Sequence, residues 1–263
     1  MLGHALELIE EGNKRGIPLR LLGALAIYVH CPSNRHLYEK VWRAPTDIDM
    51  ITYSKFRGKV VKLMEQFGYR PVQRFVALYG MFRHIYYSDE RDVRVDLFFD
   101  KLEMCHTINF KNRLELDSPT IPVEDLLLEK LQIVKISEKD LKDIIILLKE
   151  HDVGPADDRE IIDIRYIAKL LAKDWGFYYT VTLNLDRIKK YMRANPGPLA
   201  EEDIQEVEAK IDRLREAIEK EPKSLRWKLR ARTGPKKKWY RDVTEEFAAI
   251  VMEGGEWKVK KEG

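Results

Sequence analysis

Apolar residues spaced three and four positions apart alternate in this chain with shorter apolar runs, which predicts a mixture of helices and strands. Helical spacing, capping residues or a proline start indicate helices over 1–11, 24–29, 54–68, from 122, from 137, and over 159–173, 185–194 and 201–220. Strand patterns cover 19–22, 69–75, 82–87 and 93–99, and the polar residues 88–92 form a turn that joins the last two into a hairpin.

The order of these elements predicts an α+β protein with two domains. Residues 1–152 would form a mixed sheet flanked by helices, and residues 153–263 a helical C-terminal domain. The chain has 263 residues, of which 44% are hydrophobic, so it can bury a full core. One helix has a heptad-like face that we expect to pack inside the molecule, with a partner helix as the alternative: Ile204, Val207, Ile211, Leu214 and Ile218.

Three aspartates on predicted strands are the strongest indication of chemistry. Asp47 and Asp49 flank one residue of an extended run, so their side chains point the same way, about 7 Å apart. Residues 43–46, with a proline, end any helix and lead into this run extended, and Asp96 interrupts the apolar pattern of 93–99. A strand-end cap or a surface pair is the structural alternative. Converging carboxylates repel unless a cation neutralises them, and oxygen-only ligands favour Mg²⁺ or Mn²⁺.

The turn at Gly23-Ala24, the Asp-x-Asp strand and the later Asp strand occur in an order that resembles the nucleotidyltransferase superfamily, which shares the DNA polymerase beta palm. Residues 122–130 and 139–144 resemble the helices that follow the core in the AbiEii-type branch, which includes toxin nucleotidyltransferases. Residues 175–178 and 184–185 extend this likeness weakly, so that it covers roughly residues 15–190.

The resemblance implies an enzyme that moves a nucleoside monophosphate from a nucleoside triphosphate to an acceptor hydroxyl, with pyrophosphate leaving. Mg²⁺ or Mn²⁺ would be the cofactor, RNA is a candidate acceptor, and a cognate antitoxin-like protein is a candidate partner. Asp47, Asp49 and Asp96 would be the catalytic residues and the metal ligands. Lys130 would offset triphosphate charge, with a solvated helix lysine as the alternative, and the implied nucleotide-binding residues are Gly23, Ala24, Lys130, Lys139, Asp140 and Asp143.

The chain departs from the family pattern at two places. Gly23-Ala24 stands where Gly-Gly or Gly-Ser is usual, so no serine hydroxyl can contact the triphosphate. The stretch from 30 to 42 is long and could form a loop over the site; it contains Asn34, Arg35, His36 and Tyr38. Three other functions therefore stay open: a small-molecule nucleotidyltransferase of the antibiotic type, a degenerate nucleotide-binding module without catalysis, and a metal-dependent hydrolase.

The net charge of +3 hides a basic segment at residues 223–241, which has nine basic residues and no acid. Alternating apolar and basic residues over 225–232, followed by a Thr-Gly-Pro turn, predict a β-hairpin with one basic face. Such a surface suits RNA, and a solvated surface hairpin is the alternative. The predicted nucleic-acid-binding residues are Arg226, Lys228, Arg230, Arg232, Lys236, Lys237 and Lys238.

Cysteine and histidine usage indicates neither a disulfide framework nor a zinc motif. Cys31 and Cys105 are expected to be free thiols, and the six histidines have no ligand-like spacing and are expected to be structural. No apolar run approaches the roughly 20 residues of a membrane span. Because residues 1–14 also lack a signal-peptide arrangement, we expect a cytoplasmic protein that does not contact membranes.

Overall fold

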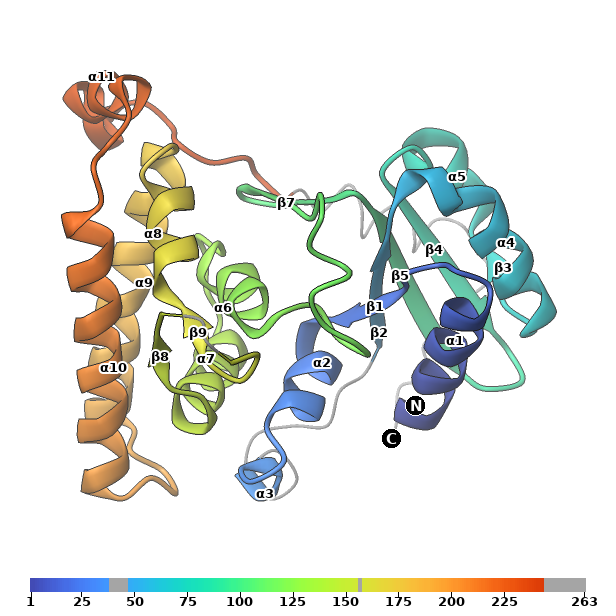
Figure 1. Ribbon diagram of the computed structural model, residues 1–263, viewed down its shortest axis with the longest axis horizontal. Helices are drawn as coiled ribbons and strands as arrows, with labels where there is room; N and C mark the ends of the chain where they lie inside the picture. Colours follow the sequence, from blue (N-terminus) through green and yellow to red (C-terminus); the bar gives the residue numbers. More distant parts are fainter. Residues whose placement is uncertain (38–46, 156–157, 244–263) are drawn as a thin grey trace, which may run out of the picture.

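The computed structural model describes residues 1–37, 47–155 and 158–243, and it is an α+β structure as predicted. Figure 1 shows a sheet with its own helices on one side of the molecule and a group of helices on the other, with α2 between them. Several described segments connect the two groups, among them the chain that follows α11.

The central sheet has five strands in the order β1-β2-β5-β4-β3. Only β2 and β5 run parallel; the other neighbouring pairs are antiparallel. The strands are β1 (Arg20–Leu22), β2 (Ile48–Thr52), β3 (Arg70–Pro71), β4 (Arg83–Ser88) and β5 (Val93–Phe99). The predicted hairpin of residues 82–99 is confirmed as β4 and β5. The register pairs Asp49 with Asp96 and Leu22 with Asp49, so three central strands meet at one point.

Three helices accompany the sheet: α1 (Leu2–Lys14), α4 (Arg57–Gln66), which follows the short 3₁₀ turn η2 (Ser54–Phe56), and α5 (Gln73–Tyr79). The strand predicted over 69–75 is wrong beyond β3, because α5 begins at Gln73. Pro71 has no amide hydrogen with which to continue the ladder, and the following Gln, Arg, Ala and Leu residues favour a helix.

The second group contains α6 (Val123–Leu131), α7 (Glu138–Glu150), α8 (Ile164–Leu171), α9 (Trp175–Ala194) and α10 (Glu201–Lys220), while α2 (Gly23–His30) and the short α3 (Arg35–Leu37) lie beside it. The predicted capping box of Ser137 and Asp140 is confirmed at the start of α7. The predicted helix over 159–173 begins only at Ile164, because β8 (Val153–Gly154) pairs with β9 (Ile162–Asp163) and Asp163 caps α8. Helix α9 begins earlier than predicted, where Asp174 accepts a hydrogen bond from the Phe177 amide.

The heptad-like face of α10 is buried in the core, as predicted: Ile204, Val207, Ile211, Leu214 and Ile218 are each at most 3% exposed. It packs against α7, α8 and α9. Helices α6 and α7 contact α2 as well as the later helices, and the domain boundary at residue 152 stays a prediction.

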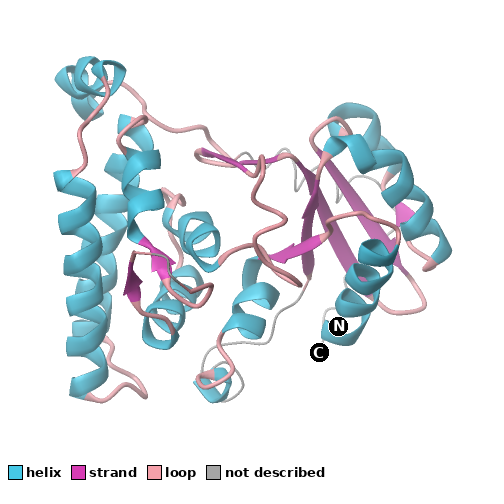
Figure 2. Ribbon diagram, in the orientation of Figure 1, coloured by secondary structure: helices cyan, strands magenta, loops and turns pink. Residues whose placement is uncertain are grey.

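Residues 225–233 form a helix, α11 (Leu225–Thr233), followed by the 3₁₀ turn η3 (Gly234–Lys236), so the predicted β-hairpin is wrong (Figure 2). Ser224 caps the helix by accepting a hydrogen bond from the Trp227 amide at 3.1 Å. The Leu, Lys, Arg and Ala residues that follow are good helix formers, and this propensity outweighs the alternating pattern. A single basic face is lost, because on a helix Arg226 and Arg230 share one side while Lys228 and Arg232 lie about half a turn away.

A short hairpin that the sequence pattern did not reveal consists of β6 (Lys101–Glu103) and β7 (Thr107–Asn109). Each strand has only three residues, which is too short for a recognisable period. Among the described residues, no helix combines the length and apolar character that crossing a bilayer requires.

Candidate active site

The three predicted aspartates converge at the middle of the sheet. Asp49 lies on β2 opposite Asp96 on β5, and Asp47 directly precedes β2. One carboxylate oxygen from each of Asp47, Asp49 and Asp96 lies within 4.8 Å of those of the other two. This spacing allows one or two cations to be bound between them.

Asp96 is the most enclosed of the three, with 2% of its surface exposed. Its Oδ2 accepts charge-assisted contacts from Arg94 at 2.6 Å and from Arg83 at 2.9 Å. Its Oδ1 is buried and has no hydrogen-bond partner among the described residues. A buried carboxylate oxygen without a partner is costly, and a bound cation would remove that cost.

The electrostatics around Asp49 are unfavourable to its charge. Burial and the nearby carboxylates of Asp96, Asp47 and Glu129 raise the pKa of Asp49 well above its usual value, and Lys130 only partly opposes them. The oxygen-only donor set, the mutual repulsion and the unpartnered Asp96 oxygen fit a divalent cation such as Mg²⁺ or Mn²⁺.

Gly23 brings the start of α2 against Asp49. Its φ of +72° is left-handed, and a Cβ there would overlap Asp49 Oδ2 and lie 3.2 Å from Asp49 Cγ. Its amide donates a hydrogen bond to Glu129 Oε2 at 3.0 Å. The amide predicted to contact a phosphate therefore already binds a carboxylate, and Ala24 is buried within α2. Glu129 is a site residue that the sequence reasoning missed, and burial raises its pKa.

Lys130 is buried rather than solvated, with 7% of its surface exposed. Its ammonium lies 2.9 Å from Asp143 and 3.3 Å from Asp140. Burial opposes its charge, but Asp143, Glu129 and Asp140 raise its pKa above the usual value. Asp140 and Asp143 thus position Lys130, while Lys139 is exposed.

A cavity of about 860 Å³ opens next to the aspartates. Of the predicted nucleotide-binding residues, Lys130 lines it, and Gly23, Ala24, Lys139, Asp140 and Asp143 are not among its described lining residues. The lining also includes charged and aromatic residues that the sequence reasoning had not assigned to the site: Arg83, Arg94, Glu129, Lys135, Tyr240 and Arg241. Arg94 could have been found, because it lies two residues before Asp96 and so on the same strand face. Arg83 could not, because its proximity depends on the register of β4 and β5.

The chain after α11 crosses from the helices to the β6–β7 hairpin and lines the cavity with residues 240–243 (Figure 1). The Trp239 indole donates to Thr180 Oγ1 on α9 at 3.0 Å. Arg241 is anchored on the hairpin: its amide donates to the Cys105 carbonyl at 3.0 Å, and its guanidinium donates to the Met104 carbonyl and to Thr107 Oγ1. This segment forms part of the cavity wall.

The seven predicted nucleic-acid-binding residues lie on and after α11, outside the described lining of the cavity. Arg230 is engaged within the protein, where it donates to the Gly234 and Lys237 carbonyls and stacks over the Trp175 ring. Lys238 is paired with Asp242. The exposed members are Arg226, Lys228, Arg232, Lys236, Lys237 and Lys238.

The sequence predicts a loop over the site in residues 30–42. The described part of this stretch is instead held against the end of α7. The amides of Ser33 and Asn34 and the Asn34 side chain all donate to the Glu150 carboxylate at the end of α7. Arg35 and His36 are in α3. Tyr38 and the expected extended approach of residues 43–46 lie outside the described residues.

Neither the available protein-family models nor the curated proteins contain a match to this sequence. Solved structures that are similar to it include the following two. The solution structure of the antibiotic-resistance factor ANT(2'')-Ia has a TM-score of 0.38 at 14% identity and covers 55% of this chain and 80% of its own. The crystal structure of an antigenic nucleotidyltransferase-like protein from Paracoccidioides brasiliensis has a TM-score of 0.41 at 12% identity and covers 85% of this chain and 94% of its own. At these scores neither likeness decides function, and neither bears on the AbiEii-type branch.

Proposed function

We propose that this protein is a metal-dependent nucleotidyltransferase that moves a nucleoside monophosphate from a nucleoside triphosphate to an acceptor hydroxyl. The observation that carries the proposal is the convergence of Asp47, Asp49 and Asp96 within 4.8 Å at the edge of a large cavity. The sequence resemblance to the nucleotidyltransferase superfamily, which rests on the Gly23-Ala24 turn and on the order of these aspartates, supports the same assignment.

In this proposal the three aspartates hold Mg²⁺ or Mn²⁺, which when bound would neutralise triphosphate charge and lower the pKa of the acceptor hydroxyl. The hydroxyl loses its proton to water and its oxygen attacks the α-phosphorus, the bond from that phosphorus to the oxygen shared with the β-phosphate breaks, and pyrophosphate leaves. Lys130 is fixed by Asp140 and Asp143 at the cavity and would attract the phosphates. Arg83 and Arg94 extend this positive potential along the wall.

RNA is the acceptor that the basic surface favours. Lys228, Arg232, Lys236 and Lys237 are exposed, and the same segment continues into the cavity wall at Tyr240. Basic side chains would bind a phosphate backbone, and Tyr240 offers an aromatic ring for a base. A toxin-like role with an antitoxin-like partner belongs to this proposal through the sequence resemblance alone.

A small-molecule acceptor is the second candidate, and the closure of the cavity wall by residues 240–243 supports it. A cavity of about 860 Å³ is large enough for a nucleotide together with a compact acceptor. The charges on the described lining do not favour one acceptor, since five carboxylates and five cationic side chains face it.

The test is to incubate the protein with each labelled nucleoside triphosphate, Mg²⁺ or Mn²⁺, and either total RNA or a panel of aminoglycosides. We expect label on RNA and release of pyrophosphate. Asp47→Ala and Asp49→Ala should abolish both, and the exposed Asp212→Ala should keep them. Transfer that survives in both site variants would contradict the proposal. Triphosphate binding without pyrophosphate release would indicate a non-catalytic module instead.

A second set of variants in the same transfer assay identifies the acceptor. Lys228→Glu with Arg232→Glu should weaken RNA-dependent transfer and reduce its salt dependence, because phosphate contacts release counterions. Lys220→Glu, a charge reversal at an exposed residue of α10, is the control. Unchanged RNA transfer in the double variant would remove α11 from the acceptor site.

A further inference from the structure

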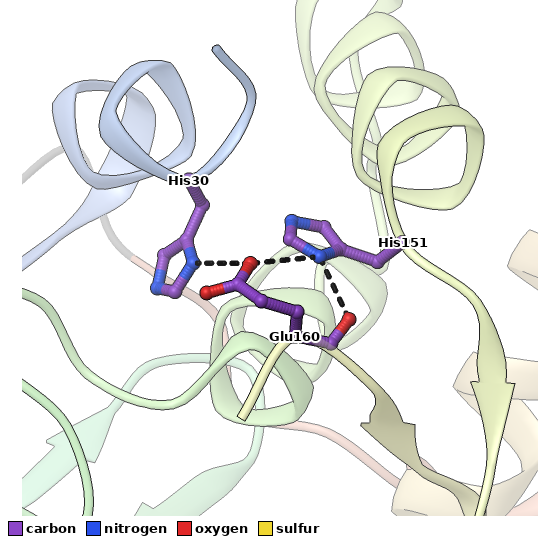
Figure 3. A group of neighbouring side chains, drawn as sticks. All are labelled: His30, His151 and Glu160. Carbon is purple, nitrogen blue, oxygen red and sulfur yellow. Dashed lines mark hydrogen bonds and ion pairs between the residues drawn. The ribbon is translucent and has the colours of Figure 1, made fainter. Parts of the chain in front are cut away.

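Two histidines and a glutamate from distant parts of the sequence meet at the opposite end of α2 from Gly23, the residue that contacts Asp49. His30 is the last residue of α2, His151 follows α7, and Glu160 precedes β9. Figure 3 shows the Glu160 carboxylate between the two imidazole rings. One ligand atom from each residue lies within 4.8 Å of those of the other two.

The three side chains are in close contact. Glu160 Oε2 lies 3.3 Å from His151 Nδ1 and 3.9 Å from His30 Nδ1, and the ring centroids are 5.6 Å apart. Both histidines are buried, whereas the Glu160 side chain is 64% exposed. The cluster therefore has a protein-enclosed half and a half that water can reach.

The outer contacts of His30 resemble those that orient a metal-ligating histidine. Its Nε2 lies 2.6 Å from Thr120 Oγ1, 3.3 Å from the Ile121 carbonyl and 3.3 Å from Asp117 Oδ2. Such partners fix the proton on Nε2 and leave the Nδ1 lone pair facing the cluster.

The surroundings of His151 provide a second, independent indication of a ligand at this cluster. Its Nδ1 lies 2.9 Å from the Glu160 carbonyl, while its Nε2 is buried and has no hydrogen-bond partner among the described residues. Because a carbonyl only accepts, the ring proton is on Nδ1, and the lone pair of Nε2 is left without a partner in a residue that is 2% exposed. Buried polar atoms in native proteins are nearly always satisfied, and a cation is one partner that would satisfy this ring.

We propose that His30, His151 and Glu160 form a site for a transition-metal ion of the Zn²⁺ class. Two imidazoles and one carboxylate suit Zn²⁺, whereas Mg²⁺ prefers oxygen ligands and is better matched by the aspartates. Water would complete the coordination on the exposed side. No spacing motif predicts this site, because its residues are brought together only by the fold.

Metal bound at this site would fix the C-terminal end of α2. Metal bound here ties the end of α2 to the end of α7 and to the segment before β9. Gly23 and His30 are the two ends of the eight-residue helix α2, about 10 Å apart along its axis. Because Gly23 packs against Asp49, metal bound here would hold the helix whose first residue contacts the aspartate site.

The test measures Zn²⁺ binding by calorimetry on the metal-stripped full chain, together with the ligand-field spectrum of the Co²⁺ form and the Tm. Wild type should bind one Zn²⁺ with a Co²⁺ spectrum of nitrogen and oxygen ligands and a raised Tm. Glu160→Gln, which keeps the size of an exposed side chain, should lower the affinity at least about tenfold and abolish the Tm rise. His151→Gln should do the same, and the exposed His36→Gln should bind as wild type does.

Asp49→Asn separates this site from the aspartates: the proposal requires that this variant keep the Zn²⁺ affinity of the wild type. Loss of binding in Asp49→Asn together with normal binding in Glu160→Gln would place the metal at the aspartates and overturn the inference. Wild type that binds no Zn²⁺ would also overturn it and leave the cluster as an ion pair only. Neither result depends on nucleotidyl transfer, so the two proposals can fail separately.

Discussion

At the scale of single residues, the candidate site combines buried, mutually repelling charges with close packing. Asp49 is surrounded by other carboxylates, Asp96 keeps one buried oxygen without a partner, and Gly23 leaves no room for a side chain. The features at Asp49 and Asp96 cost stability when no ligand is present. Together they are typical of a binding site rather than of a core.

Gly23→Ala should abolish transfer, because its methyl group would push Asp49 out of place, and it should also destabilise the protein. Gly16→Ala is the matched control, since Gly16 has a similar φ of +69° but nothing within 4 Å of the added Cβ. Both variants suffer the left-handed backbone penalty of about 1 kcal/mol. Denaturant unfolding and transfer assays should show a similar backbone cost in both but lost activity only in Gly23→Ala. Equal activity of the two variants would argue against this packing.

Asp49→Asn should stabilise the metal-free protein while removing its response to Mn²⁺. The raised pKa of Asp49 means that its charged form is disfavoured in the folded state, so its contribution to stability is lost as pH rises through the folded pKa. At neutral pH the neutral amide avoids this cost, and we expect a Tm a few degrees higher in the presence of a chelator. Mn²⁺ should raise the Tm of the wild type only. A lower Tm without metal would show that the carboxylate stabilises the fold.

At the scale of elements, the sequence was informative where local signals and packing agree. The hairpin of β4 and β5, the capping box of α7 and the extent of α10 all followed from period and caps. Prediction failed for α11, where an alternating pattern competed with helix propensity, and for β6 and β7, which are too short to show a period. The convergence of the three aspartates was predictable, because Asp47 and Asp49 belong to one extended run and Asp96 to a predicted strand. Arg83, Glu129 and the His30 cluster depend on long-range contacts.

The β6–β7 hairpin docks on α9 through His106, and this contact should depend on pH. Burial lowers the pKa of His106 to about 4; its ring stacks on Phe177, with centroids 4.9 Å apart, and its Nε2 bonds Thr180 Oγ1. The unfolded chain binds the proton with a pKa near 6.5. Stability from this contact is therefore complete above pH 6.5 and is lost as the pH falls toward 4, by about 3 kcal/mol at most.

His106→Gln should flatten the pH dependence of the free energy of unfolding between pH 6.5 and 4, measured by urea titration at several pH values. His84 and His151, whose pKa values burial also lowers, remain in both proteins, so the informative quantity is the difference in slope. The exposed His36→Gln should keep the wild-type slope. Identical slopes for His106→Gln and wild type would mean that the hairpin does not carry the acid sensitivity.

At the scale of the whole molecule, the candidate active site lies where the sheet meets the helical group. The sheet supplies Asp47, Asp49 and Asp96, α6 supplies Glu129 and Lys130, and the segment after α11 supplies the remaining wall. The basic helix α11 stands at the start of that segment, so a ligand bound by its charges would lie along a chain that leads to the cavity (Figure 1). This continuity is the structural reason to expect that acceptor binding and catalysis are connected.

The central claim is that three aspartates hold catalytic cations, and anomalous diffraction from crystals grown with Mn²⁺ and a non-hydrolysable nucleoside triphosphate tests it most directly. The account predicts a Mn²⁺ peak within about 2.0–2.3 Å of oxygens from Asp47, Asp49 and Asp96, with the triphosphate beside Lys130. Crystals of Asp49→Asn grown in the same way should lose that peak. A nucleotide bound with no Mn²⁺ between the three carboxylates, or Mn²⁺ bound only elsewhere, would contradict the account.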